Sequence, residues 1–326
     1  MSKWYVGIDV SKDELVAAVA GRKPKIFADT VAGSKALYRW ANALAMGNPL
    51  HICLEATGVY GHRAALTLAA YPKTEVSVVN PAQIAAFAKA QLRRSKTDAL
   101  DAQVILAFVQ SQQPQPWQPD SDVRRQLYAL VAEWDALAET KGRLTDRDHS
   151  HTYIPDLPRA VSRAQKKIVQ TLEREIARLE EAVIRLCDTT PELKAQVPLL
   201  CTIPGVKTTT AVHLLAYGKD ALTTYSRKEL TAHAGLAPKQ HQSGSSIRGK
   251  SRLAKQGDKR LRRTLYMPVL CGIKHNPVIA ARCQHLCQNR KAKMVAIAAC
   301  MRKLLLIIQA MLKHQKPFNP ELIPLT

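Results

Sequence analysis

The stretch WYVGIDVSKDELVAAV, residues 4–19, decides the expected fold of the first part of the chain. Two apolar runs, residues 4–10 and 14–19, flank a short polar turn, and this pattern is typical of a hairpin of two strands. Asp9 interrupts the first run. Because an unpaired carboxylate within an apolar strand is costly, the pattern marks Asp9 as a candidate functional residue.

Strand and helix patterns alternate after this hairpin. Residues 25–28 predict a third strand, and short apolar strands at 51–55 and 76–79 are each followed by a helical pattern. Glu55 ends the first of these two strands, and Pro81, after the second, suits the first turn of a helix. A hairpin followed by such alternation predicts an α/β domain with a mixed sheet.

A polar stretch rich in proline, residues 110–119, ends the alternation and predicts a first domain at residues 1–119. Residues 120–195 then carry apolar residues at 3-and-4 spacing in two successive helices, which favours a helical coiled-coil arm. A plain surface helix packed on its own domain is the alternative. We expect residues 196–326 to form a mainly α-helical C-terminal domain.

The turn IPGV, residues 203–206, lies between two helical patterns and resembles a helix-hairpin-helix element. In such an element Gly205 would let the backbone approach a phosphate, and Lys207 would lie beside it. A simple turn that connects two helices fits the sequence equally well.

The chain is strongly basic, with 48 Lys and Arg against 26 Asp and Glu, and a formal net charge of +22. A surface of this kind favours a polyanionic partner, because it gains affinity by displacing counterions from phosphates. Nucleic acid is the first expectation and an anionic membrane surface the second. A hydrophobic content of 46% indicates a folded protein rather than a disordered one.

The sequence gives no signal for export or for a disulfide framework. Charged residues from Asp9 to Glu14 interrupt the apolar N-terminus, and no stretch approaches 18 uncharged apolar residues, so we expect a cytoplasmic protein. The seven cysteines are an odd number scattered along the chain. Cys283, His285 and Cys287 are close in sequence, but without a second ligand cluster we favour buried or idle thiols over zinc.

Four carboxylates suggest metal chemistry. In KTDALDA, residues 96–102, Asp98 and Asp101 are three positions apart and share one helix face. Together with Asp9 in one strand and Glu55 at the end of another, they match the oxygen ligands that two-metal cleavage of a phosphodiester needs. This order resembles the RNase H-like fold and its RuvC-type nucleases. The cations Arg93, Arg94 and Lys96 would then hold the phosphate backbone.

Each carboxylate also has a structural interpretation. Asp98 could belong to a helix cap that begins at Ser95, Asp101 could be a solvated helix residue, and Glu55 could mark a strand leaving the core. The ordered set favours a site for Mg²⁺ or Mn²⁺, because Asp9 and Glu55 both interrupt apolar strands.

A second group of candidates lies at SGSS, residues 243–246, amid many cations. A flexible contact to nucleic acid is the simple interpretation. The more specific interpretation is that Ser243 is a nucleophile that attacks a phosphodiester, and that guanidinium groups stabilise the charge of the transition state. His241 is assigned no catalytic role. The candidate contacts to nucleic acid in this region are Arg248, Lys250, Arg252, Lys255, Arg262 and Arg263.

The segments GIDVSKDEL, ICLEATGVY, KTDALDA, TIPGVKTTTA, AGLAPKQHQSGSSIRGKSRLAKQGDKRLRRTLYMPV and MRKLL occur in this order and span nearly the whole chain. They resemble the transposases of the insertion-sequence 110 family and its pilin-inverting relatives. The resemblance implies a RuvC-like domain at 1–119, an arm at 120–195 and a transposase domain at 196–326. It also implies that Asp9, Glu55, Asp98 and Asp101 form a DEDD metal tetrad and that Ser243 forms a covalent phosphoserine link to DNA.

The same resemblance implies the partners. They would be donor and target DNA and a structured non-coding guide RNA, with no membrane, in the cytoplasm of a bacterium. The protein would be a homo-oligomer, a dimer or tetramer, whose active sites combine the RuvC-like domain of one subunit with the transposase domain of another. Two other functions stay open from the residues alone: a RuvC-like Holliday-junction resolvase or nuclease that uses water, and a basic regulator that binds DNA or RNA without catalysis.

Overall fold

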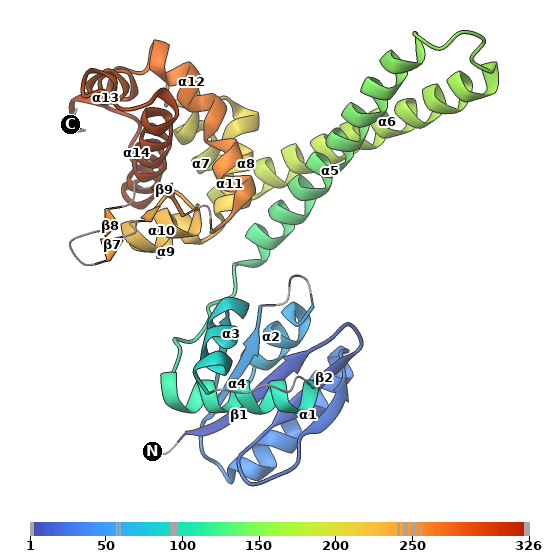
Figure 1. The fold of residues 1–326 in the computed structure, drawn as a ribbon, viewed down its shortest axis with the longest axis vertical. Coiled ribbons are helices and arrows are strands. Elements are labelled where there is room, and N and C mark those ends of the chain that lie inside the picture. The colour runs from blue at the N-terminus through green and yellow to red at the C-terminus, as the bar shows by residue number, and fades with distance from the viewer. Residues whose placement is uncertain are drawn as a thin grey trace. The chain divides into compact units, whose positions relative to one another are not determined.

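The protein is represented by a computed structural model, which describes residues 3–56, 58, 60–91, 97–239, 242–243, 247–248, 252–254 and 256–322 (Figure 1). Residues 239, 242–243, 247–248 and 252 are described by their backbone. The chain divides into two compact units, Met1–Pro119 and Asp120–Thr326, and each is taken by itself below.

The first unit contains a five-stranded mixed sheet in the order β3-β2-β1-β4-β5. β1 pairs antiparallel with β2 and parallel with β4, and β5 continues the parallel part, so the predicted mixed sheet is confirmed. The elements are β1(Trp4–Val10), β2(Glu14–Ala18), β3(Lys25–Ala28), α1(Val31–Ala45), β4(Leu50–Glu55), α2(His62–Ala69), β5(Thr74–Val79), α3(Pro81–Ala90) and α4(Asp98–Gln112).

Side chains along a strand alternate between the two faces of the sheet. Both faces of this sheet carry apolar side chains, and helices cover both. On one face Val6 and Ile8 of β1 pack in a core with residues of α1 and α2 such as Leu37 and Leu68. On the other face Cys53 packs in a core with residues of α3 and α4. Each face of β1 therefore has its own helical layer.

Gly7 brings α4 into direct contact with the sheet. A Cβ atom at this position would lie 2.2 Å from the backbone nitrogen of Leu106 and 2.5 Å from the backbone oxygen of Ala102. Any side chain at residue 7 would push α4 off β1, since real Cβ atoms do not approach so closely. Glycine in the middle of this strand thus sets the helix-to-sheet distance.

The second unit is mainly helical. It begins with two long helices that pack as an antiparallel hairpin, the arrangement that their apolar spacing predicts (Figure 1). The hairpin is made of α5(Asp122–His151) and α6(Arg159–Thr189). The elements that follow are α7(Pro191–Cys201), α8(Thr208–Gly218), α9(Ala221–Thr224), α10(Arg227–His233), β6(Pro238–Lys239), β7(Gln242–Ser243), β8(Ile247–Arg248), β9(Arg252–Leu253), α11(Lys259–Thr264), α12(Tyr266–His275), α13(Pro277–Gln288), α14(Lys293–His314) and the 3₁₀ turn η1(Pro320–Leu322).

The base of the hairpin is part of the main core of this unit. Leu127 and Val131 of α5 and Val183 of α6 are buried in the same apolar cluster as α7, α8 and α14. Arg124 is buried beside them and donates hydrogen bonds to Glu192 Oε1 and Gln196 Oε1, each at 2.5 Å. The arm and the following helices therefore share one core.

A polar network also joins α5 to α8. His213 Nε2 lies 3.0 Å from Asp135 Oδ1, and its Nδ1 lies 2.6 Å from the backbone oxygen of Thr209. Both partners are acceptors, so this geometry favours the doubly protonated imidazolium. Burial would lower the pKa of His213, but its bonds to Asp135 and Thr209 outweigh burial and raise it. The Tyr217 hydroxyl donates to Asp135 Oδ2 at 2.5 Å.

We expect Tyr217→Phe to lower the free energy of unfolding by about 1.5–3 kcal/mol, because it removes a hydrogen bond to a charged group. Chemical denaturation of the full chain measures the change. Tyr128→Phe is the matched control, since the Tyr128 ring packs edge-on against Tyr217 in the same core. Equal losses in the two variants would contradict a special role for the bond to Asp135.

Among the described residues, one helix, α14, has the length and apolar composition of a membrane span. Arg302 and Lys303 divide its apolar sequence. Most of the helix is buried inside the second unit, where residues such as Leu304, Leu305 and Ile308 belong to the main core. Burial of this kind is typical of a core helix in a folded domain.

Candidate functional site

The sheet places Asp9 and Glu55 next to each other. β1 and β4 are parallel neighbours in which Ile8 lies opposite Leu54, so the following residue on each strand is Asp9 and Glu55. Asp9 also lies opposite Val16 of β2, which packs in the core beneath α4. Because side chains alternate along a strand, Asp9 and Glu55 point to the α4 side of the sheet.

The first turn of α4 supplies the other two carboxylates. Thr97 caps the helix, and its hydroxyl accepts a hydrogen bond from the backbone N–H of Leu100 at 3.3 Å. The observed cap is therefore Thr97 rather than Ser95, and Asp98 is the first residue of the helix. Asp101 lies one turn later, and both acids are favoured by the helix dipole.

Gly7 explains why these acids face Asp9. It contacts α4 at Ala102 and Leu106, and Asp9 is two residues further along the same face of β1. Two strand residues and one helical turn cover similar distances, about 6 Å. Asp9 therefore faces the turn that precedes Ala102, which contains Asp98 and Asp101.

The charges of the other three carboxylates act on Asp9. Burial, followed by the charges of Asp101, Asp98 and Glu55, raises its pKa from an ordinary 3.8 to about 6, although a hydrogen bond with the Val10 backbone opposes the shift. In the described part of the chain, no three His, Cys, Asp or Glu side chains lie close enough together to hold a metal ion. The four carboxylates are thus close enough for three of them to affect the pKa of Asp9, although no three of them lie close enough together to hold a metal ion.

The raised pKa predicts a dependence of stability on pH. Ionised Asp9 destabilises the fold above pH 6, and this penalty disappears as Asp9 takes up a proton between pH 6 and 4. Without divalent ions, Asp9→Asn should raise the free energy of unfolding by about 1–2 kcal/mol at pH 7.5, after allowance for solvent screening, and change it little at pH 4.5. Denaturant titrations at both pH values measure this. An equal change in stability at both pH values would contradict a raised pKa of Asp9.

Ser243 lies in a different unit, in a ribbon of short strands. It ends β7, where its backbone pairs with Ile247 of β8, and Gln242 pairs with Arg248. β6 and β9 pair outside this hairpin, with Lys239 opposite Arg252. The backbone thus places Ser243 and Arg248 in one two-stranded ribbon, β7-β8, and Arg252 in a separate two-stranded sheet. The candidates Arg93, Arg94, Lys96, Lys250 and Lys255 lie outside the described residues.

Gly205 has a structural reason to be glycine. Its φ is +97°, and a Cβ atom there would lie 2.8 Å from the backbone oxygen of Pro268 in α12. The sequence interpretation assigned this glycine to an approaching phosphate, whereas in the structure its open side faces a neighbouring helix. Lys207 is exposed at the start of α8.

Gly205→Ala should therefore destabilise the protein by at least about 2 kcal/mol, because it combines a left-handed backbone with a clash at Pro268. Thermal unfolding of the full chain without nucleic acid tests this. Gly142→Ala in the arm is the control, since a Cβ there meets nothing within 4 Å. A Gly205→Ala protein of unchanged stability but weakened DNA binding would restore the phosphate interpretation.

The remaining cations differ in their surroundings. Arg262 Nη1 donates to the backbone oxygen of Ala234 at 3.1 Å, so part of its guanidinium group serves the fold. Arg263 is exposed, and its charge contributes to lowering the pKa of Asp135. In α13, Cys283 is buried and Cys287 is exposed.

Sequence reasoning passed over two residues that position the carboxylates. Gly7 sits in the middle of an apolar strand, which is a signal for a close backbone approach. Thr97 precedes the helical pattern of residues 98–112, which is the position of a helix cap.

Two family models match the chain in order. A DEDD transposase model of the IS110 type, described as a transposase, matches residues 6–152, and the transposase IS116/IS110/IS902 family matches residues 197–284. The chain is 33% identical over 330 residues to the pilin gene-inverting proteins of Moraxella bovis and Moraxella lacunata, covering 98% of each chain. It is 26% identical over 214 residues to the transposase for insertion sequence element IS1328 of Yersinia enterocolitica, covering 59% of this chain and 62% of that protein. With both models matched and relatives that are similar from end to end, this chain belongs to the IS110 family of transposases, which are DNA recombinases.

Proposed function

We propose that this transposase cuts and rejoins DNA through a covalent bond between Ser243 and a DNA phosphate, assisted by a divalent metal ion held by Asp9, Glu55, Asp98 and Asp101. The observation that carries the proposal is the position of Asp9 and Glu55 on adjacent strands, facing the acidic first turn of α4. Such convergence of hard oxygen ligands is what cleavage of a phosphodiester with Mg²⁺ or Mn²⁺ requires.

The topology of the first unit supports an RNase H-like fold for this domain. An antiparallel run of three strands is followed by two parallel strands, and α4 packs back across the sheet at Gly7. In this arrangement the acids of the sheet lie on the face that α4 covers, where they act on one another electrostatically.

The donor set fits a divalent cation. Four carboxylates supply only oxygen ligands, and their mutual repulsion, expressed in the raised pKa of Asp9, would be relieved by positive charge. A bound Mg²⁺ or Mn²⁺ ion would neutralise charge on the reacting phosphate. Thr97 positions the two helical ligands through its cap, and Gly7 keeps them near the sheet.

Ser243 is proposed to attack the phosphorus atom with its hydroxyl oxygen. The bond from phosphorus to one DNA sugar oxygen breaks as the phosphoserine bond forms. The proton of the serine hydroxyl is transferred to this leaving oxygen, which becomes a DNA hydroxyl group. Attack by the hydroxyl of another strand reverses these changes, so strands are exchanged without an external energy source. The pairing of Gln242 with Arg248 in the ribbon that contains Ser243 supports a phosphate-binding environment.

The partners of the reaction are part of the proposal. Donor and target DNA follow from the family, and a structured guide RNA and a dimer or tetramer are proposed from the resemblance alone. The net charge of +22 is compatible with both nucleic acids. Two relatives are named for inverting a gene, which requires rejoining as well as cutting and supports recombination over hydrolysis.

Trapping the covalent intermediate tests this function. The protein is expressed from its own locus with the flanking non-coding RNA and element ends, supplied with Mg²⁺ and quenched with detergent. We expect protein covalently attached to DNA. Cut DNA without attached protein would indicate hydrolysis by water, as in a junction resolvase, and would overturn the serine mechanism.

A further inference from the structure

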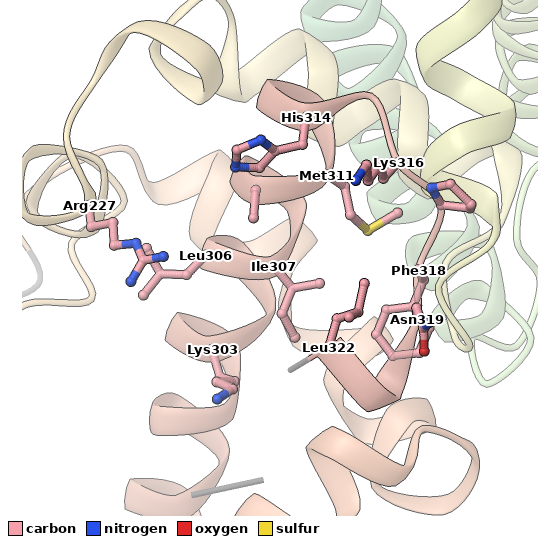
Figure 2. Close-up of a pocket in the computed structure, with 12 residues that line it drawn as sticks. Arg227, Lys303, Leu306, Ile307, Met311, His314, Lys316, Phe318, Asn319 and Leu322 are labelled. Carbon is pink, nitrogen blue, oxygen red and sulfur yellow. The ribbon is translucent and has the colours of Figure 1, made fainter. Parts of the chain in front are cut away.

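The second unit contains a cavity of about 530 Å³ beside α14 (Figure 2). This volume is in the range of sites that bind small molecules. Its lining residues are Arg227, Lys303, Leu306, Ile307, Ala310, Met311, His314, Lys316, Pro317, Phe318, Asn319 and Leu322.

One stripe of α14 forms the floor of the cavity. Lys303, Ile307, Ala310 and His314 are three or four residues apart and so share one face of the helix. The opposite face, with residues such as Leu305 and Leu312, is packed in the main core, and Ile307 of the stripe also borders this core. The helix is therefore held by its buried face and presents the other face to the cavity.

The cavity combines an apolar floor with cations. Figure 2 shows Ile307, Leu322 and Phe318 between basic side chains, with Arg227 and Lys303 on one side and His314 and Lys316 toward another. No acid occurs among the described residues that line it. Such a lining favours a ligand with an apolar body and more than one negative charge.

The cations also repel one another. Burial, and then the charges of Arg282 and Arg227, lower the pKa of Lys303. A bound anion would relieve this repulsion.

The walls are fixed before any ligand enters. Gln309 Nε2 and Lys313 Nζ donate to the backbone oxygen of Tyr225, at 2.8 and 3.0 Å, which ties α14 to the start of α10. A capping box between Ser226 and Glu229 then begins α10 and sets Arg227 as its first residue.

The other wall is fixed in the same way. The backbone N–H of Phe318 donates to Thr202 Oγ1 at 3.0 Å, and the Asn319 side chain accepts from the backbone N–H of Glu321 at 2.9 Å. Because both walls are held by such bonds, a ligand would not have to order them.

We propose that this cavity binds one unstacked base of single-stranded nucleic acid, with backbone phosphates held by Arg227 and Lys303 on one side and by Lys316 on the other. The base would pack on Ile307 and Phe318, since every base has an aromatic face. This inference rests on the proposed function for the class of ligand. It adds a site in the helical unit that neither the metal tetrad nor Ser243 occupies.

Photocrosslinking tests the site directly. The probe is a ten-nucleotide single-stranded RNA, and separately a DNA of the same length, with 5-iodouracil at each position. We expect crosslinked peptides from residues 303–322 of the full-length protein. Lys303→Gln and Arg227→Gln should each weaken binding about five- to tenfold. Arg302→Gln, one residue away on the exposed side of α14, should change it less than twofold.

Each other outcome overturns the proposal. Crosslinks confined to other elements, such as α11, would remove this cavity as a nucleic-acid site and leave the recombinase function standing. Binding of phosphatidylglycerol vesicles that is lost in Lys303→Gln, without any oligonucleotide crosslink, would assign the cavity to a lipid surface. Thermal unfolding of both cavity variants shows whether they are folded, and the covalent adduct test reports on the recombinase function independently.

Discussion

Ser243→Ala is expected to abolish the covalent protein–DNA adduct and to reduce recombination by about 10³-fold or more, because the variant lacks the oxygen atom that we propose as the nucleophile. Binding to DNA and RNA should stay within about twofold of the wild type, since one hydroxyl group contributes little to binding dominated by many phosphate contacts. Quantitative gel analysis of the detergent-quenched reaction measures the adduct, and a shift assay on the same preparations measures binding.

Ser246→Ala is the matched control for this experiment, because it removes a hydroxyl group from the same SGSS segment. It should retain the adduct. If both variants lost nucleic-acid binding together with activity, the segment would be a contact loop and Ser243 would not be the nucleophile. An adduct that persists in Ser243→Ala would place the covalent bond on another residue.

Asp9→Asn should change activity and stability in opposite directions. We expect recombination and adduct formation to fall by about 10³-fold, since the variant loses one of the four proposed carboxylate ligands of the metal ion. The protein should at the same time be more stable above pH 6 in buffer without metal, because the mutual repulsion of the four acids is reduced. Adduct yield and denaturant titration on one preparation measure both quantities.

Asp13→Asn is the control for Asp9→Asn. Asp13 lies in the exposed turn that connects β1 to β2, so its replacement removes the same charge from the same hairpin without entering the α4 face of the sheet. It should leave activity within about twofold. Full recombination by Asp9→Asn would contradict the metal assignment, whereas loss of activity with loss of stability would indicate a damaged fold.

The elements with strong periodicity were predictable from the sequence. Alternation in residues 4–19 predicts the hairpin, and the long 3-and-4 pattern predicts the two helices of the arm, because both patterns arise from local geometry. The ribbon that includes Ser243 was not predicted as strands. Its strands are only two residues long and its composition is that of a loop, so no periodicity can develop.

The candidate sites also divide into residues with a local sequence signal and residues whose contacts form only in the folded chain. The carboxylates on β1, β4 and α4 were predictable, since a strand end and a helix start have local signals. The contact of Gly205 with α12 could not be predicted, because Pro268 lies more than 60 residues later in the chain and no local pattern reveals it. Arg227 and Lys303 were missed for a similar reason, because α10 and α14 meet only in the folded unit.

The base of the arm is fixed in the core of the second unit, and this has a mechanical consequence for α5. α5 has 30 residues and is therefore about 45 Å long, yet Arg124 and Asp135 anchor its first half to α7 and α8. A helix clamped at one end behaves as a lever, so a force applied near Tyr153 at the free end produces torque at the clamp. The load would pass through His213 and Tyr217 to α8 and, through the Arg260 guanidinium over the Tyr217 ring, to α11. Strain from a partner that grips the tip would thus be transmitted to the basic helix that follows the serine ribbon.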